Sequence, residues 1–127
     1  MLGIAREVLH ELIGWDGEIS INTINRGPEN AASIYSRSRG KAYRAAVGRA
    51  SSYSLGYFSL FLRLGADEGL ADESAQQIFE RLAGSLFDFG GRRGFVSAVY
   101  DAPIWLGADK MRIHEYSIDF DLYLEKK

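Results

Sequence analysis

Residues 54–64 read SLGYFSLFLRL, an apolar run that an extended chain divides between two faces, because alternate side chains of a strand point to opposite sides. One face carries Phe58, Leu60, Leu62 and Leu64, and the other carries Leu55, Tyr57 and Phe61. A strand with apolar residues on both faces is usually central and covered twice. We therefore predict a central strand, covered by the chain's own helices or by a neighbouring subunit.

A turn and a helix are expected directly after this strand. Gly65 begins the turn, and Asp67 and Glu68 favour a helix N-terminus because carboxylates interact well with the unpaired amides there. Apolar positions at helical spacing predict the helix itself from about residue 70 to residue 86. Its predicted core stripe consists of Leu70, Ala71, Ser74, Ala75, Ile78, Phe79, Leu82 and Leu86.

The other segments are assigned by the same periodicities. Residues 2–13 are expected to form an amphipathic helix, and residues 18–26 a short strand that a Gly-Pro pair stops. Residues 90–94 are glycine-rich and are expected to form a loop before a strand over 95–100. Residues 113–124 alternate apolar with polar or acidic side chains, which predicts a strand with one core face and one acidic face.

This order of elements predicts a single α+β domain over residues 1–127. The expected architecture is a mainly antiparallel sheet of four to five strands with two helices packed on one face. A chain of 127 residues is long enough for one core and too short for two ordinary ones. A basic arm or long loop is expected at about residues 27–52, where Ile34 and Tyr35 suggest only a short strand.

Composition limits the classes of function. The formal net charge is −2 and the pI is about 5.7, whereas dedicated nucleic-acid-binding domains are typically basic. There is no cysteine, which excludes disulfides and thiolate metal sites. No signal peptide and no apolar run long enough to span a bilayer are recognisable. The protein is expected to be soluble, with no membrane partner, and cytoplasmic where it is made.

The charge distribution is uneven, because the stretch from Arg26 to Arg49 is about +5 in an acidic chain. Glu29 is its one anion, and its cations are Arg26, Arg37, Arg39, Lys41, Arg44 and Arg49. Such a stretch can be a solvated loop, a subunit interface or a nucleic-acid contact. Tyr35, Tyr43 and Tyr53 offer some aromatic side chains for stacking on bases.

The acidic face of the last predicted strand offers a complementary surface. Glu115, Asp119 and Asp121 can receive the arginine arm of an adjacent copy, for example Arg37 and Arg39. Such a contact joins different surfaces of the two copies and therefore builds a ring. This hypothesis rests on charge complementarity alone.

The residues indicate no catalytic or metal site. His10 and His114 lack a partner carboxylate and a nucleophile at useful spacing, so structural or solvated roles are expected for both. The acidic cluster at Asp67, Glu68, Asp72 and Glu73 has no metal-loop spacing and is better explained by helix capping. The glycine-rich run at 90–94 lacks the GxxxxGK[ST] phosphate-loop pattern. We therefore expect no enzyme activity, no cofactor and no bound metal.

Two long segments carry a resemblance to a known family. These are YFSLFLRLGADEGLADESAQQIFERLAG at 57–84 and APIWLGADKMRIHEYSIDFDLYLEK at 102–126, with the closing pattern EYSIDFDLYL. The chain resembles the tail terminator and tail completion proteins of phages, a group that includes the small minor capsid proteins of siphophages and prophages. The similarity is best from residue 53 to residue 124 and weakest from 26 to 52.

The resemblance implies a structural role in the virion. Such subunits form a ring, commonly a hexamer, at the head-proximal end of the tail, where they stop growth of the tail tube and meet the head–tail connector. The implied partners are other copies, the tail tube protein and the connector protein, with non-specific contact to DNA in transit. The resemblance carries over no cofactor and no catalytic residue. In such a ring the basic residues Arg37, Arg39, Lys41, Arg44 and Arg49 would line the lumen or contact the next subunit.

Three classes of function therefore remain at the level of the sequence. A ring-forming virion protein predicts a closed oligomer in sedimentation. A small nucleic-acid-binding regulator that uses residues 26–49 predicts an affinity that falls steeply with salt. A small enzyme predicts a pocket where at least two titratable groups converge.

Overall fold

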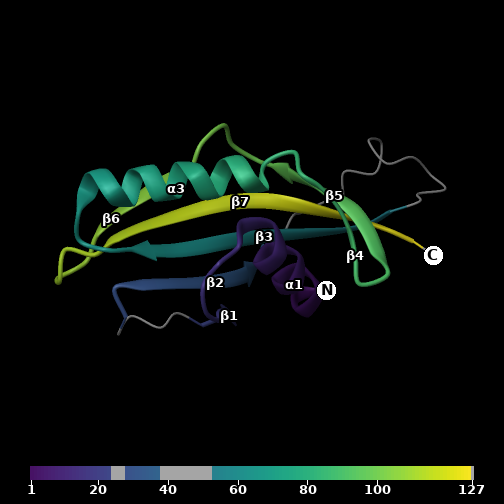
Figure 1. Ribbon diagram of the computed structural model, residues 1–127, viewed down its shortest axis with the longest axis horizontal. Helices are drawn as coiled ribbons and strands as arrows, with labels where there is room; N and C mark the ends of the chain where they lie inside the picture. Colours follow the sequence, from purple (N-terminus) through teal and green to yellow (C-terminus); the bar gives the residue numbers. More distant parts are fainter. Residues whose placement is uncertain (24–27, 38–52, 127) are drawn as a thin grey trace.

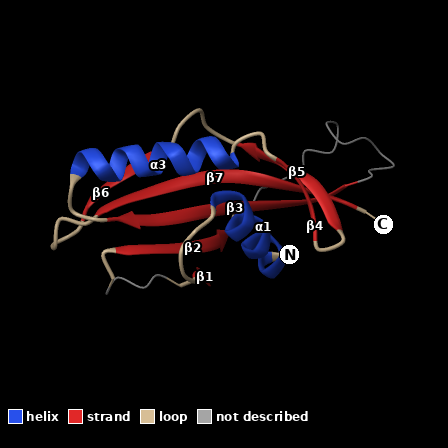
Figure 2. Cartoon of the chain, viewed as in Figure 1, coloured by secondary structure: helices blue, strands red, loops and turns tan. Residues whose placement is uncertain are grey.

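The structure, a computed structural model, describes residues 1–23, 28–37 and 53–126. It confirms the α+β class, with two helices and a mostly antiparallel sheet among these residues (Figure 1, Figure 2). The expected four to five strands are too few, since the described residues form seven. In chain order the elements are α1 (Leu2–Ile13), β1 (Ile19–Ile21), β2 (Asn30–Ser36), β3 (Tyr53–Leu64), α3 (Glu68–Leu82), β4 (Leu86–Phe89), β5 (Arg92–Ala98), β6 (Ile104–Ala108) and β7 (His114–Glu125).

The long strands β3 and β7 form the centre of the sheet, as the apolar and alternating sequence patterns predict. They pair antiparallel from Tyr53 opposite Glu125 to Arg63 opposite Glu115. The strand order is β1-β2-β3-β7-β5-β4, and among the described strands only the β1–β2 pair is parallel. Because β3 occupies one edge of β7, both β5 and β6 must pair with its other edge, β5 near the C-terminal end and β6 near the N-terminal end.

Both helices pack on one face of this sheet, as expected. The buried side chains of α1 and α3 join one core cluster with Phe58, Leu60 and Leu62 of β3 and with Ile118 and Phe120 of β7. Helix α1 contacts β1 and β2, and α3 contacts β3 and β7 (Figure 1). Neither described helix covers the opposite face of β3. The prediction that a neighbouring subunit covers that face therefore stays open.

The first turn of α3 forms as the sequence predicts, but its C-terminal end does not. The side chain of Asp67 caps the helix by accepting a hydrogen bond from the N–H of Leu70, at 2.9 Å. The helix ends at Leu82, because Ala83 is extended with ψ of 122° and Gly84 is left-handed with φ of 71°. Leu70 and Leu86 are 63% and 79% exposed, so their assignment to the core stripe is wrong.

The predicted glycine loop is instead a β-hairpin. Residues 86–89 form β4, of which only Leu86 was assigned to the preceding helix, and Gly90 and Gly91 turn the chain with φ of 61° and 74°. Strand β5 then begins at Arg92, inside the predicted loop. A side chain at Gly94 would collide with the carbonyl oxygen of Tyr123, which explains a glycine in the middle of this strand.

Two further boundaries differ from expectation around the basic stretch. Strand β1 is only three residues long, because Asn22 follows it with φ of 55°. Strand β2 occupies 30–36, so the first part of the expected arm or loop at 27–52 is a strand in the sheet. The later part of that expected arm or loop, residues 38–52, lies outside the described residues.

Candidate functional site

The acidic side chains of β7 lie on the face of the sheet opposite the two described helices. Glu115, Asp119 and Asp121 alternate with the buried core residues of the same strand, as the pattern predicts. The register places them opposite Arg63, Ser59 and Tyr57 of β3 respectively. Each carboxylate therefore has a polar group of the neighbouring strand within reach.

Arg37, the first residue after β2, reaches across β3 to Asp121. Its Nη2 lies 2.6 Å from Oδ1 of Asp121 and donates to the carbonyl oxygen of Phe120 at 3.0 Å. Its Nε donates to the carbonyl oxygen of Phe58 at 2.9 Å. The guanidinium is 20% exposed and the carboxylate 12% exposed, so this is a half-buried pair with several donors satisfied.

Arg63 forms a second network near the other end of β7. Its side chain is fully buried, and its Nη1 lies 2.8 Å from Oδ2 of Asp109 and 2.7 Å from Oε2 of Glu115. Its Nε donates to the carbonyl oxygen of Pro28 at 3.3 Å. Burial disfavours the charge, but the hydrogen bonds and attraction of the two carboxylates outweigh it and raise the pKa of Arg63. The network joins the start of β2, the end of β3 and the β6–β7 turn.

The third acidic residue is also engaged within the chain. Asp119 accepts hydrogen bonds from the hydroxyls of Ser59, at 2.6 Å, and Ser117, at 3.3 Å. Each of the three carboxylates of the predicted acidic interface strand therefore already has a partner within the chain. An arginine arm from a neighbouring copy would have to replace these contacts. Of the predicted arm residues, Arg39, Lys41, Arg44 and Arg49 lie outside the described residues.

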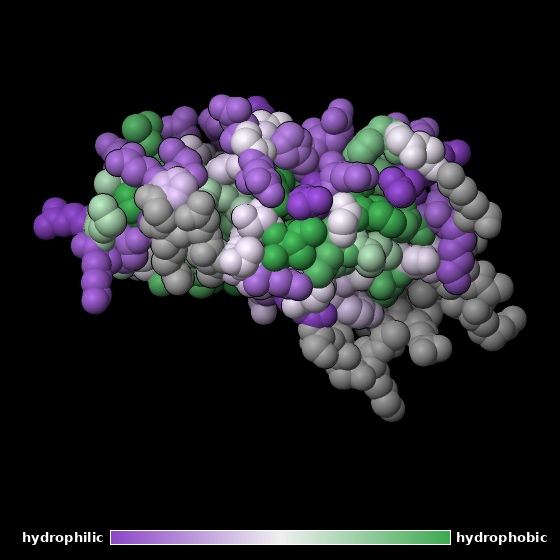
Figure 3. Space-filling model, turned by 90° about the horizontal axis from the view of Figure 1, so that it is seen from below, coloured by the Kyte–Doolittle hydropathy of each residue, from purple (hydrophilic) through white to green (hydrophobic). Residues whose placement is uncertain are grey.

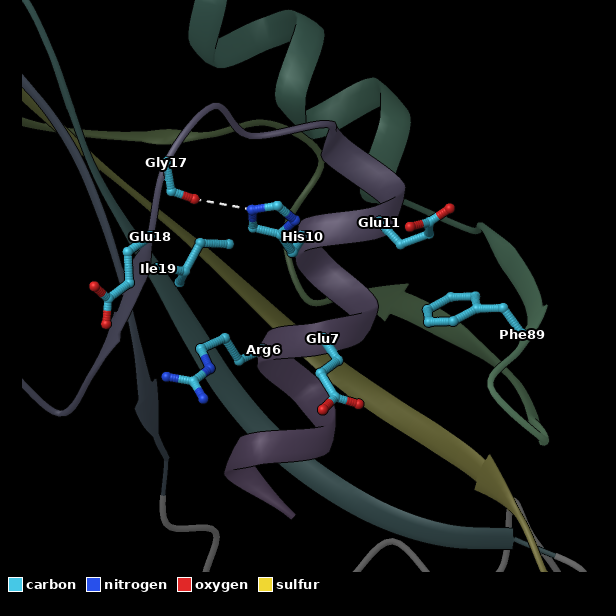
Figure 4. Close-up of a pocket in the computed structure, with 8 residues that line it drawn as sticks. All are labelled: Arg6, Glu7, His10, Glu11, Gly17, Glu18, Ile19 and Phe89. Carbon is cyan, nitrogen blue, oxygen red and sulfur yellow. Dashed lines mark hydrogen bonds between the residues drawn. The ribbon is translucent and has the colours of Figure 1, made fainter.

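A shallow hollow of about 470 Å³ lies against α1 (Figure 4). Arg6 and His10 point toward the β1 side of the helix, and Glu11 points toward Phe89 on the other side. His10 is hydrogen-bonded through Nε2 to the carbonyl oxygen of Gly17, at 2.8 Å. The imidazole is thus hydrogen-bonded to a backbone carbonyl, and Glu11 lies on the opposite side of the helix from it.

His114 has the structural surroundings that the sequence suggests. It is 8% exposed, and its Nδ1 accepts a hydrogen bond from Nε1 of Trp105 at 3.2 Å. Its neighbour Glu115 faces the opposite side of the sheet, toward Arg63. Within residues 1–23, 28–37 and 53–126, no cluster of three or more His, Asp or Glu side chains is placed to hold a metal ion. The two described helices are also too short or too polar to cross a membrane.

The feature that the sequence reading missed is an exposed apolar surface along β6. Trp105 and Leu106 are 57% and 52% exposed, and four of the five residues of β6 are exposed. Tyr100 before the strand and Met111 after it are exposed as well. The sequence did carry a signal for this strand. Residues 103–108, PIWLGA, form a short apolar run that begins at a proline and ends before a polar turn, as strands often do.

Searches of protein-family models, curated proteins and solved structures found no match to this chain.

Proposed function

We propose that this protein is a ring-forming structural subunit of a phage tail, a tail terminator or completion protein. It would cap the tail tube at its head-proximal end and join it to the head–tail connector. The observation that carries the proposal is the exposed apolar margin formed by β6 and its flanks. A large apolar surface on a small domain favours burial against another protein.

The distribution of charges supports a structural role over catalysis. Among the described residues, the buried and half-buried charges pair across strands, as Arg37 does with Asp121 and Arg63 with Glu115. The imidazoles of His10 and His114 are each held by one structural hydrogen bond. Such pairs stiffen a sheet and engage the charged groups that form them.

The resemblance of residues 57–84 and 102–126 to tail terminator proteins supplies the biological setting. In this proposal the partners are other copies of the chain, the tail tube protein and the connector protein, with DNA passing through the ring. The mature protein would reside in the virion and be made in the bacterial cytoplasm. The basic stretch would face the lumen or the next subunit.

The alternative of a nucleic-acid-binding regulator rests on residues 26–49. Arg37 is the one cation of that stretch that the structure describes, and it is committed to Asp121. A titration of single-stranded and duplex DNA at low salt decides between the two. In such a titration the logarithm of the affinity is plotted against the logarithm of the salt concentration. A slope of roughly −0.7 to −0.9 for each phosphate neutralised would favour the regulator.

Sedimentation velocity and negative-stain images of the purified chain, alone and mixed with tail tube protein, test the proposal. We expect closed rings in at least one of these samples. A strict monomer in both, at all concentrations, would overturn it.

A further inference from the structure

The turn that joins β6 to β7 is held in one shape by a single carboxylate. Oδ1 of Asp109 accepts hydrogen bonds from the N–H of Met111 at 2.8 Å and of Ile113 at 2.9 Å. Its Oδ2 contacts Arg63, and its carbonyl oxygen accepts from the N–H of Arg112, which adopts φ of 64°. The N–H of Ile113 and then the guanidinium of Arg63 lower the pKa of Asp109.

This turn presents one apolar side chain between two cations. Met111 is 71% exposed, and its neighbours Lys110 and Arg112 are exposed as well. Neither cation forms an ion pair with any residue in the described part of the chain. We call residues 110–112 the knob. Because its backbone is already fixed, docking it costs little conformational entropy, and a methionine adapts readily to an irregular surface.

The hollow against α1 has the complementary character. Phe89 is half-buried and supplies apolar surface in its lining, whereas Ile19 is only 1% exposed, and Glu11 and Glu18 are exposed carboxylates on either side of the helix (Figure 4). Neither of these two carboxylates is ion-paired with a described residue.

The charges around the hollow leave it acidic. Arg6 is a cation in the lining, whereas Glu7 is paired with Arg92 at 3.4 Å. Asp16, close by in the sequence, is exposed and adds a further negative charge. Seen from the β1 margin, hydrophobic side chains gather near the centre of the surface with hydrophilic ones around them (Figure 3).

The knob and the hollow cannot meet within one chain. The knob lies at the far left end of the molecule in Figure 1, whereas α1 lies right of the centre. In the sheet, β6 and β1 belong to opposite margins. Their complementary surfaces can therefore meet only between copies.

We propose that the knob of one copy docks into the α1 hollow of the next, which rests on the proposed ring-forming function. Met111 would pack on Phe89, while the flanking cations face Glu11 and Glu18. Because the two surfaces differ, the contact is heterologous and repeats around a closed ring. The ion pairs help to select the partner and the register of the contact. Because salt screens exposed charges, added salt should weaken assembly.

Two charge-reversed proteins test this contact. The knob variant carries Lys110→Glu and Arg112→Asp, since aspartate tolerates a positive φ better than most residues. The hollow variant carries Glu11→Lys and Glu18→Lys. Each alone should sediment as a monomer, with the dissociation constant of assembly raised at least tenfold. Mixed one to one they should assemble again, because the reversed knob meets the reversed hollow and the native knob meets the native hollow.

Controls separate this contact from general effects of charge and folding. The variant Glu73→Lys with Glu80→Lys changes the net charge as the hollow variant does, on the exposed side of α3, and should assemble like the wild type. Met111→Ser, which leaves the charges and the turn unchanged, should also weaken assembly. Circular dichroism and the melting temperature verify folding of each protein.

The outcomes distinguish this contact from the proposed function itself. Wild-type rings together with rings of both single variants would overturn the knob contact and leave the proposed function standing. Failure of the mixture to assemble, while Met111→Ser assembles normally, would overturn it too. A wild type that stays monomeric, with and without tail tube protein, would overturn the ring-forming function and this contact with it.

Discussion

Strands β5 and β6 pair with the same edge of β7, yet one is part of the core and the other is surface. Val96 of β5 is fully buried, and β4 covers the outer edge of that strand. In β6, Trp105 and Leu106 are more than half exposed, and no described strand pairs with its outer edge. The comparison shows that pairing with a central strand does not by itself bury a segment. The face must also be covered by the core, as it is at Val96 and not at the residues of β6, and at β6 we propose that another protein supplies this cover.

The largest effect is expected from Arg63, which fixes the β6 end of β7. Replacing it with methionine leaves Asp109 and Glu115 without their buried partner, so Arg63→Met should lower the free energy of unfolding by about 3–5 kcal/mol. Urea unfolding followed by circular dichroism measures it. Arg93→Met at the β5 end is the matched control, because Arg93 is 65% exposed and its ion contacts are 3.8 and 3.9 Å long. A change within about 0.5 kcal/mol is expected there.

The next effect compares one side chain from each strand. Val96→Ala should cost about 2 kcal/mol, because it removes two buried methyl groups and leaves a cavity. Leu106→Ala should change the stability of the monomer by no more than about 0.5 kcal/mol. If chemical denaturation showed the same loss in free energy of unfolding for both variants, the side chains of β6 would be as well covered as those of β5. Sedimentation of the same two proteins should show the reverse order, with assembly weakened by the Leu106 change.

The two turns that lead into β5 and β7 offer a smaller comparison. Gly90 has φ of 61° with open space around it, so Gly90→Ala should cost about 1 kcal/mol through backbone strain alone. Arg112 already tolerates φ of 64°, and Arg112→Gly relieves that strain while adding freedom to the unfolded chain. We expect a net change within about 0.5 kcal/mol. A large loss from the Arg112 change would show that its side chain, and not its backbone, holds the turn.

The smallest expected effect is on the way the stability of the protein depends on pH. The pKa of Asp109 is below its ordinary value, so its charge stabilises the fold above about pH 4 and this contribution is lost as the pH falls through the lowered pKa. Asp109→Asn keeps an acceptor for the turn and removes the charge. The difference in melting temperature between wild type and this variant should shrink between pH 5 and pH 2, as expected for one carboxylate. A difference that stays constant with pH would contradict the charge pairing with Arg63.

Much of the fold was predictable because its main elements have clear periodicities. The helical spacing of residues 2–13, the apolar run at 54–64 and the alternation at 113–124 each specify one kind of element. The hairpin of β4 and β5 was missed for a specific reason. Leu86 lies four residues after Leu82 and so continues the helical pattern beyond the point where Gly84 ends it.

The candidate site was predicted only in its parts. Arg37 and Asp121 were both singled out, one as an arm residue and one as an acidic interface residue. Charge complementarity suggested a contact between copies, and that the two pair within one chain could not be predicted, because 84 positions separate them and β3 lies between them. Arg63 drew no attention in the sequence, since a lone arginine in an apolar strand gives no sign of its partners.

The sequence by itself determined the α+β class, the central strands and the side of β7 that carries the acids, because these depend on the local period of apolar residues. The tertiary structure alone decided which charges pair, which strands gain a second neighbour and where apolar side chains stay exposed. Those outcomes depend on contacts between segments far apart in the chain. The knob, held by Arg63 from a distant strand, and the α1 hollow on the opposite margin are two such outcomes.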